Sequence, residues 1–210
     1  MTDSAKFITF EGGEGVGKST QVKKLAEHLE NKGINFILTR EPGGSPGAEE
    51  IRELLVKGGT DKWQPMTEAL LHKAARAEHL DKTVKPALDA GKWVISDRYA
   101  DSTLAYQGYG QGVEIETLLE LHKVSTNDFW PDLTVVLDGH ELARAQERED
   151  DNADKEDRYE RMGDDFHKKL QESFLDIAKN NPERCVVVSA SGTIDEVAQR
   201  VWDAVKLLLS

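Results

Sequence analysis

The sequence has a single cysteine, Cys185, so no disulfide can form within the chain and no cysteine pair is present for a zinc site. Cys185 begins an apolar run, residues 185–188, where a buried structural thiol is more common than a reactive one. The chain also lacks any stretch close to the ~18 apolar residues of a membrane-spanning helix. Its first residues lack the apolar segment of a signal peptide. We therefore expect a cytoplasmic protein without a membrane partner.

Positive charge is scarce as well. The 210 residues include 27 Lys and Arg against 39 Asp and Glu, which gives a net charge of -12. This balance argues against a protein that neutralises a nucleic-acid backbone over a broad face, although small anions can still bind in a local basic pocket. The length suits one domain, residues 1–210, with a lid or insertion.

Glycine is concentrated in one segment that directly follows the apolar run 7–10. This segment matches the phosphate-binding pattern G-x-x-x-x-G-K-[ST] and predicts an ATP site whose glycines allow backbone N–H groups to surround the triphosphate. Lys18 would contact the β- and γ-phosphates, and the Ser19 hydroxyl would bind Mg²⁺. The predicted binding residues are Gly12, Gly13, Glu14, Gly15, Val16, Gly17, Lys18, Ser19 and Thr20.

Five short apolar runs alternate with segments of helical length, which predicts an α/β fold: a five-stranded parallel sheet with helices on both faces. The runs are 7–10, 34–38, 93–95, 133–137 and 186–188. Apolar residues at helical spacing predict a helix directly after the P-loop, and Gly33 marks its end. Thr193 and Glu196 form a capping box for a last helix whose buried face would include Ile194.

Asp97 and Arg98 end the third apolar run, and strand ends line the ligand crevice of an open α/β sheet. There Asp97 would belong to the Mg²⁺ shell while Arg98 reaches a phosphate. A simple salt bridge at the strand end is an equally common alternative. The D-x-x-G and N-K-x-D patterns of switch GTPases and the L-S-G-G-Q signature of transporter ATPases are missing.

One segment differs in composition from the rest of the chain. Residues 147–165 contain ten acidic residues against Arg148, Lys155, Arg158 and Arg161. Such a charge run is usually a solvated loop. Alternatively it is a lid, at about residues 147–162, that excludes water and brings arginine to the transferred charge.

Six segments in order, residues 10–12, 39–44, 67–71, 74–76, 97–99 and 105–108, give the chain a family resemblance over essentially its full length. The sequence resembles the thymidylate kinase family. The resemblance implies a P-loop kinase fold, a homodimer, and transfer of the ATP γ-phosphoryl group to dTMP with Mg²⁺ held near Ser19 and Asp97.

The resemblance also implies the acceptor site. Arg52, Arg76 and Arg98 would bind the dTMP phosphate, although without the family Arg52 and Arg76 read as solvated helix residues. The predicted contacts to the nucleoside are Thr103 and Gln107 at the pyrimidine edge, Tyr106 beside the 2′ position and Glu14 near the 3′-hydroxyl.

His72 departs from the family pattern, which usually has a phenylalanine stacked on thymine at this position. An imidazole offers less apolar area and can carry charge near neutral pH. We therefore expect weaker or pH-dependent dTMP binding, or an altered tolerance of the base. A kinase for another monophosphate such as dUMP or dCMP stays open, as does a non-catalytic P-loop NTP-binding protein.

The resemblance leaves two places for a catalytic arginine, the P-loop or the lid, and residues 14–16 contain none. The lid must then supply it, alongside Lys18, Asp97 and Arg98. We predict that Arg148→Ala or Arg158→Ala lowers kcat on the order of 10³-fold, as loss of an arginine finger does. Near-normal turnover of both single variants in a steady-state assay would exclude the lid assignment.

Overall fold

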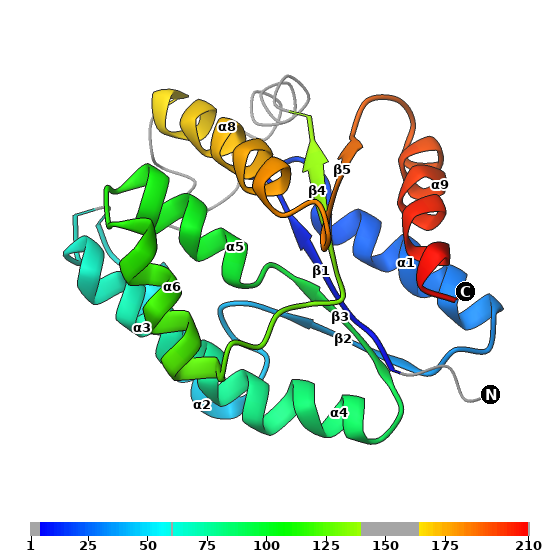
Figure 1. Cartoon of the computed structure of the whole chain (residues 1–210), viewed down its shortest axis with the longest axis horizontal. Coiled ribbons are helices and arrows are strands. Elements are labelled where there is room, and N and C mark those ends of the chain that lie inside the picture. Colours follow the sequence, from blue (N-terminus) through cyan, green and yellow to red (C-terminus); the bar gives the residue numbers. More distant parts are fainter. Residues whose placement is uncertain (1–4, 60, 140–163, 210) are drawn as a thin grey trace.

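Five parallel strands form one sheet, as the apolar runs predicted (Figure 1). The computed structural model of the chain describes residues 5–59, 61–139 and 164–209. The strand order is β2-β3-β1-β4-β5, which places β1 between the two halves of the sheet. The strands are β1 (Phe7–Glu11), β2 (Phe36–Arg40), β3 (Trp93–Asp97), β4 (Leu133–Asp138) and β5 (Cys185–Ser189).

Helices connect the strands. The α-helices are α1 (Lys18–Asn31), α2 (Pro46–Val56), α3 (Pro65–His79), α4 (Lys85–Asp89), α5 (Ala100–Thr103), α6 (Ile115–Thr126), α8 (Asp164–Asn180) and α9 (Ile194–Val205). Two π-helical turns, η1 (Leu80–Val84) and η2 (Leu104–Gly110), continue α3 and α5, and a 3-10 turn, η3 (Lys206–Leu209), continues α9.

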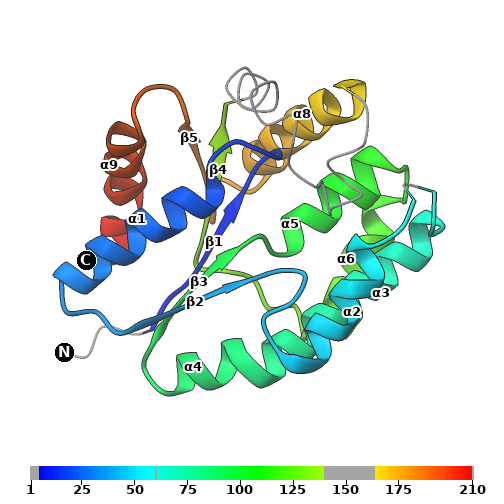
Figure 2. The ribbon, with the colours of Figure 1, turned by 180° about the vertical axis from the view of Figure 1, so that it is seen from behind.

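The two faces of the sheet carry different side chains because strand residues alternate in direction. Ile8 and Phe10 of β1 pack with α1 and α9 on one face, in an apolar cluster. Thr9 and Glu11 point to the other face, which α2 to α6 and α8 cover (Figures 1 and 2). The buried polar groups of the fold therefore gather on the second face.

The carboxyl ends of β1, β2 and β3 lie next to one another. The register pairs Phe10 with Asp97 and Asp97 with Arg40, so residues that follow three different strands meet at one edge of the sheet. This is the edge at which ligands bind in open α/β sheets.

Local sequence signals are confirmed at most positions. The capping box between Thr193 and Glu196 is present, and Gly33 has a φ of 69° just after α1. The expectation for Ile194 was wrong, because this first residue of α9 is 55% exposed. As the first residue of α9, it lies at the helix terminus, where fewer neighbours cover a side chain.

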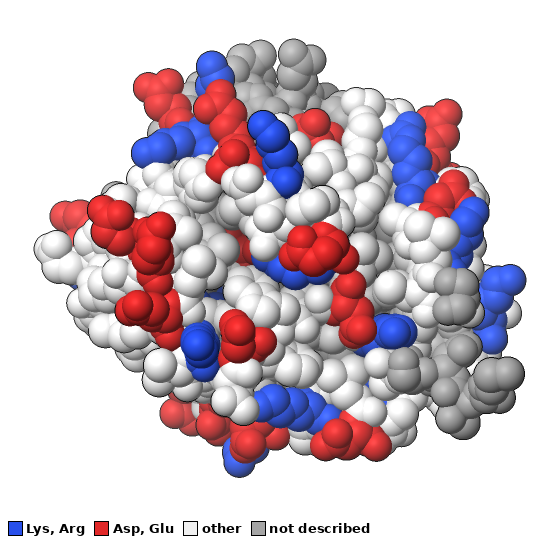
Figure 3. Space-filling view, viewed as in Figure 1, with Lys and Arg blue, Asp and Glu red and all other residues white. Residues whose placement is uncertain are grey.

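The predicted lid and its arginines, Arg148 and Arg158, lie outside the described residues, so their roles stay predictions. Among the described helices, none is long and apolar enough to cross a membrane. Figure 3 shows acidic and basic side chains interspersed over the face seen in Figure 1, where the described residues form no continuous basic area.

Candidate active site

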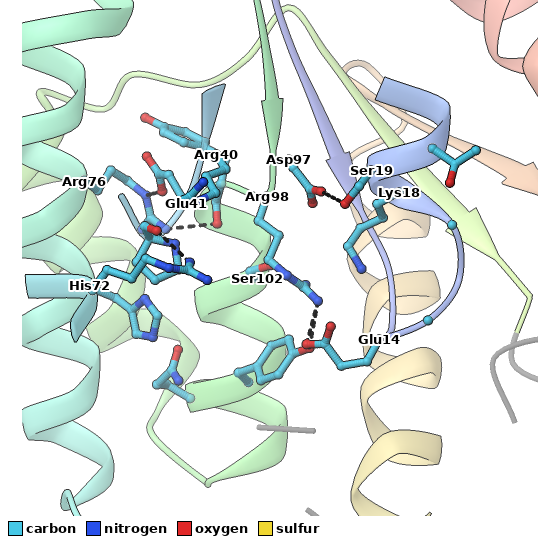
Figure 4. Close-up of a pocket in the computed structure, with 18 residues that line it drawn as sticks. Glu14, Lys18, Ser19, Arg40, Glu41, His72, Arg76, Asp97, Arg98 and Ser102 are labelled. Atoms are coloured by element: carbon cyan, nitrogen blue, oxygen red, sulfur yellow. Dashed lines mark hydrogen bonds and ion pairs between the residues drawn. The ribbon is translucent and has the colours of Figure 1, made fainter. Parts of the chain in front are cut away.

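A pocket of about 450 Å³ lies at the carboxyl edge of the sheet. Its walls come from the P-loop, the end of β2, helices α2 and α3, the end of β3, and α5 with η2. Figure 4 shows Lys18 and Ser19 on one side of this pocket and His72 and Arg76 on the other, with Arg98 between them. One cavity therefore joins the predicted ATP residues to the predicted acceptor residues.

The P-loop adopts a backbone that needs glycine at three positions. Gly12, Gly15 and Gly17 have φ values of 133°, 66° and 94°, and a Cβ atom on Gly12 would lie 2.7 Å from the Leu137 carbonyl oxygen. Lys18 folds back over the loop, where its Nζ donates to the carbonyl oxygens of Gly12 at 3.1 Å and Gly13 at 2.6 Å. The carbonyl oxygens of the loop therefore hold the Lys18 ammonium in place.

Burial, and then the charge of Arg98, lowers the pKa of Lys18 to about 8. An anion beside the ammonium would counter both effects by favouring its charged form. The other residues predicted to bind ATP do not all line the pocket. Glu14, Gly15, Gly17, Ser19 and Thr20 line the pocket with Lys18, whereas Val16 packs in the core of the α1 face.

Ser19 and Asp97 are in direct contact, although 78 positions separate them in the chain. The Ser19 hydroxyl donates to Asp97 Oδ2 at 2.6 Å, at the point where α1 begins and β3 ends. Two hard oxygen ligands therefore lie side by side in the pocket, the arrangement that Mg²⁺ uses together with phosphate oxygens.

Arg98 has a φ of 70°, an uncommon left-handed conformation for a residue other than glycine. Its own hydrogen bonds hold it there. The amide donates to Phe10 O at 2.9 Å, and the carbonyl oxygen accepts from the Ser96 hydroxyl at 2.8 Å. The guanidinium donates to Gly12 O at 3.2 Å, to Ser102 Oγ at 3.0 Å and to Glu14 Oε1 at 2.8 Å. Such strain is typical of functional sites, where the surroundings fix the residue.

Glu14 and Tyr106 complete the contacts of this guanidinium. Arg98 donates to the Tyr106 hydroxyl oxygen at 3.1 Å, and that hydroxyl donates to Glu14 Oε1 at 2.6 Å. Burial alone would raise the pKa of Glu14, but the charges of Arg98 and Lys18 outweigh it and lower the pKa to about 2. Glu14 is therefore an ionised hydrogen-bond acceptor at neutral pH.

Arg76 is 2% exposed, so its interpretation as a solvated helix residue was wrong. Glu41 accepts from Arg76 Nε at 2.7 Å and from His79 Nδ1 at 2.9 Å, while Arg76 Nη2 donates to Tyr99 O at 2.9 Å. Arg76 Nη1 is buried without a hydrogen-bond partner among the described residues. An unpaired buried donor costs about 1–3 kcal/mol, so Arg76 Nη1 is suited to bind an anionic ligand.

Arg52 and Arg40 add two more cations to the pocket wall. Arg52 is half-buried on α2 and donates to Pro42 O at 2.9 Å. Arg40 was not among the predicted site residues, although it ends β2 as Asp97 ends β3. The rule that identified Asp97 would also have identified Arg40.

Of the two residues predicted at the pyrimidine edge, only one lines the pocket. Gln107 of η2 lines the pocket. Thr103 does not line it: its buried hydroxyl oxygen accepts from Arg76 Nη2 at 3.1 Å, so Thr103 supports the arginine from behind. His72 lines the pocket from α3, one helical turn before Arg76.

His72 is uncharged at neutral pH. Burial lowers its pKa to about 3, with further contributions from the charges of Arg76, Lys73, Arg98 and Arg52. The sequence suggested that its charge would change near neutrality, and the burial of His72 beside these cations contradicts that expectation.

Glu11, at the end of β1, was also missed as a site residue. It is fully buried and accepts hydrogen bonds from Tyr99 N at 2.8 Å and from the Ser102 hydroxyl at 2.6 Å. Ser102 in turn accepts from Arg98, so Glu11 supports that arginine indirectly. Sequence signals for this role are weak, because the partner residues follow a different strand.

Comparison with known proteins identifies the family. The family model for thymidylate kinase matches residues 10–201. The curated thymidylate kinase of Rhizorhabdus wittichii is 44% identical over 97% of this chain and 98% of its own length, and that of Dinoroseobacter shibae is 48% identical over 96% of both. The crystal structure of thymidylate kinase from Ehrlichia chaffeensis superposes with a TM-score of 0.77 at 36% identity, covering 97% of this chain and 99% of that one.

Glu11 yields a prediction about stability. Burial, and then the charge of Asp101, raises the pKa of Glu11 from 4.5 to about 7, so the folded protein retains a proton that the unfolded chain releases. The resulting stabilisation is complete below about pH 4.5 and is lost as the pH rises to 7. Relative to Glu11→Gln, the wild-type free energy of unfolding should fall by roughly 1.4 kcal/mol per pH unit in this window.

Urea denaturation of both proteins at intervals from pH 5 to 8.5 measures the effect. Glu53→Gln, at an exposed helix position, is the matched control and should run parallel to wild type. Parallel curves for Glu11→Gln and wild type would show that Glu11 does not titrate as described.

Proposed function

This chain belongs to the thymidylate kinase family and phosphorylates dTMP, and we propose that ATP binds at the P-loop end of its pocket and dTMP at the α3 end, on opposite sides of Arg98. The observation that carries this arrangement is the buried Arg76, whose Nη1 lacks a partner among the described residues while its other nitrogens are anchored. It supports a second anion site in the cavity that contains the P-loop.

For the donor site, the P-loop amides and Lys18 would hold the ATP phosphates. The start of α1 directs its backbone N–H groups and positive dipole end to the same place. Ser19 and Asp97 would hold Mg²⁺, whose charge, when bound, offsets that of the phosphates.

For the acceptor site, Arg76 and Arg52 would bind the dTMP phosphate, with Arg98 reaching it from the P-loop side. Arg76 offers a fixed donor because Glu41 and Tyr99 O hold its other nitrogens. In the reaction, an oxygen of the dTMP phosphate forms a bond to the γ-phosphorus of ATP as the bond from phosphorus to the bridging oxygen breaks, and ADP leaves. The arginines stabilise the charge that spreads over the transferred group.

The nucleoside would lie along η2 and α3. The ionised Glu14 carboxylate, which only accepts hydrogen bonds, suits the 3′-hydroxyl, and the Tyr106 ring beside it would limit space at the 2′ position. Gln107 and His72 would contact the base. The predicted lid, with Arg148 and Arg158, would close over the phosphates and supply the arginine that the P-loop lacks.

We also propose that the protein is a cytoplasmic homodimer and that each chain forms a single domain. Helices α2, α3 and α6 pack side by side (Figure 2), and each exposes large apolar side chains. These are Leu54, Met66, Leu70 and Leu119, all at least 40% exposed. Exposed apolar groups on adjacent helices are typical of an interface with a second copy.

A coupled assay of ADP release over a panel of monophosphates tests the function. We expect release that depends on dTMP, and a rise of roughly 10- to 100-fold in the KM for dTMP in Arg76→Lys, which keeps the charge but loses the planar fork. The KM for ATP should stay near the wild-type value. Lys57→Gln, on the exposed surface, is the control.

Other outcomes of this assay are equally informative. Release that depends only on another monophosphate would contradict the assignment of dTMP, and no acceptor-dependent release would indicate a binding protein without kinase activity. An unchanged KM for dTMP in Arg76→Lys would remove Arg76 from the acceptor site.

His72 gives a second prediction for this site. Because its pKa is about 3, the charge of His72 does not change between pH 5.5 and 8.5. The phosphate of dTMP has a pKa near 6, and this affects wild type and variant equally. We expect the KM for dTMP to follow the same pH profile in wild type and His72→Phe, with any difference constant across the range. A profile that diverges below pH 7 in the wild type alone would show that His72 becomes protonated.

A further inference from the structure

Gln107 has one half of its amide group satisfied and the other half not. Its Nε2 donates to Glu68 Oε1 at 2.7 Å, and Gln111 Nε2 donates to the same oxygen at 2.9 Å. Gln107 Oε1 is buried and has no hydrogen-bond partner among the described residues. Of the buried side chains with such an atom, only Gln107 and Arg76 belong to described residues that line the pocket.

These two unsatisfied atoms differ in chemistry. Arg76 Nη1 is a donor and calls for an anion, whereas Gln107 Oε1 is an acceptor and calls for a ligand N–H or O–H group. Buried polar groups are nearly always paired in folded proteins, so a ligand that enters the pocket must supply both partners.

Glu68 determines which end of the Gln107 amide is available. Glu68 Oε1 accepts from two amide nitrogens, Gln107 Nε2 and Gln111 Nε2, so the NH₂ end of the Gln107 amide faces Glu68. A rotated amide would place two acceptor oxygens 2.7 Å apart. Glu68 is fully buried on α3, one turn before His72 on the same helical face, so it lies directly behind the pocket wall.

We propose that Glu68 is a positioning residue for base selection: it fixes the Gln107 amide so that the oxygen faces the acceptor nucleotide and favours a pyrimidine with an N–H group at N3. This inference rests on the proposed binding of the nucleoside beside Gln107. Thymine and uracil carry hydrogen on N3, whereas N3 of cytosine is a lone-pair acceptor. With cytosine, the N3 lone pair would face the amide oxygen, and that oxygen would stay without a hydrogen bond. Such a mismatch strongly disfavours binding of cytosine.

His72 cannot make this distinction by itself. A neutral imidazole carries both a donor and an acceptor nitrogen, so its chemistry alone does not select a keto over an amino pyrimidine. The discrimination between keto and amino pyrimidines then depends on Gln107, whose amide Glu68 holds from behind.

Glu68→Gln tests the proposal, because a glutamine at this position can donate or accept and lets the Gln107 amide rotate. The measured quantity is kcat/KM for dTMP, dUMP and dCMP. We expect the preference for dTMP over dCMP to fall at least tenfold, while the preference for dTMP over dUMP, which share the N3 hydrogen, stays within about twofold. A purely structural defect would lower all three together and leave both ratios unchanged.

Two further proteins complete the experiment. Gln111→Leu removes the other amide on Glu68 but keeps the contact of Glu68 with Gln107, so its ratios should equal those of wild type. Glu68→Met, with similar length and no charge, serves if Glu68→Gln does not fold, and should show the same loss of discrimination.

The wild-type protein provides a test that does not depend on folding of any variant. N3-methyl-dTMP lacks the N3 hydrogen, and its kcat/KM should be at least tenfold below that of dTMP. An unchanged ratio of dTMP to dCMP in folded Glu68 variants, or equal use of dTMP and N3-methyl-dTMP, would overturn the inference. Neither result affects the proposed function, which fails only if the wild type shows no ADP release that depends on dTMP.

Discussion

The site depends on the placement of Arg98, a buried cation that connects the P-loop to the wall of the acceptor site. Removing a guanidinium from water is costly unless its donors are satisfied, and here Gly12 O, Glu14, Ser102 and Tyr106 satisfy them. These groups belong to the P-loop, α5 and η2, so one side chain fixes the distance between the elements that would hold the two nucleotides. The left-handed backbone of Arg98 persists because this set of contacts outweighs its cost.

A second layer of buried carboxyl groups supports the first. Glu11 orients Ser102 beneath Arg98, Glu41 anchors Arg76, and Glu68 orients Gln107. In each case a carboxylate that is at most 5% exposed holds a polar group of the pocket from behind. In the proposed arrangement the pocket presents donors to phosphates and an acceptor to a base, and the groups that orient them lie behind the pocket wall.

Much of the fold could be predicted from the sequence because its signals are local. Each of the five apolar runs became a strand, the glycines of the P-loop took the conformations that only glycine adopts easily, and Thr193 capped α9. Part of the site was equally accessible. Strand-end position identified Asp97 and Arg98 and would also have identified Arg40. Thr103, in contrast, was placed at the pyrimidine edge, but α5 turns its hydroxyl oxygen towards Arg76.

The sequence by itself determined the order of strands and helices, the phosphate-binding loop and the family, because each is encoded in short continuous segments. The tertiary structure decided which charges are buried and paired. Arg76 is read as a surface residue until Glu41, 35 positions away, is packed against it. His72 appears titratable until the fold buries it, and the charges of residues from α2, α3 and the end of β3 lower its pKa further. Burial and electrostatic potential are sums over groups that are distant in the chain, so only the folded arrangement assigns them.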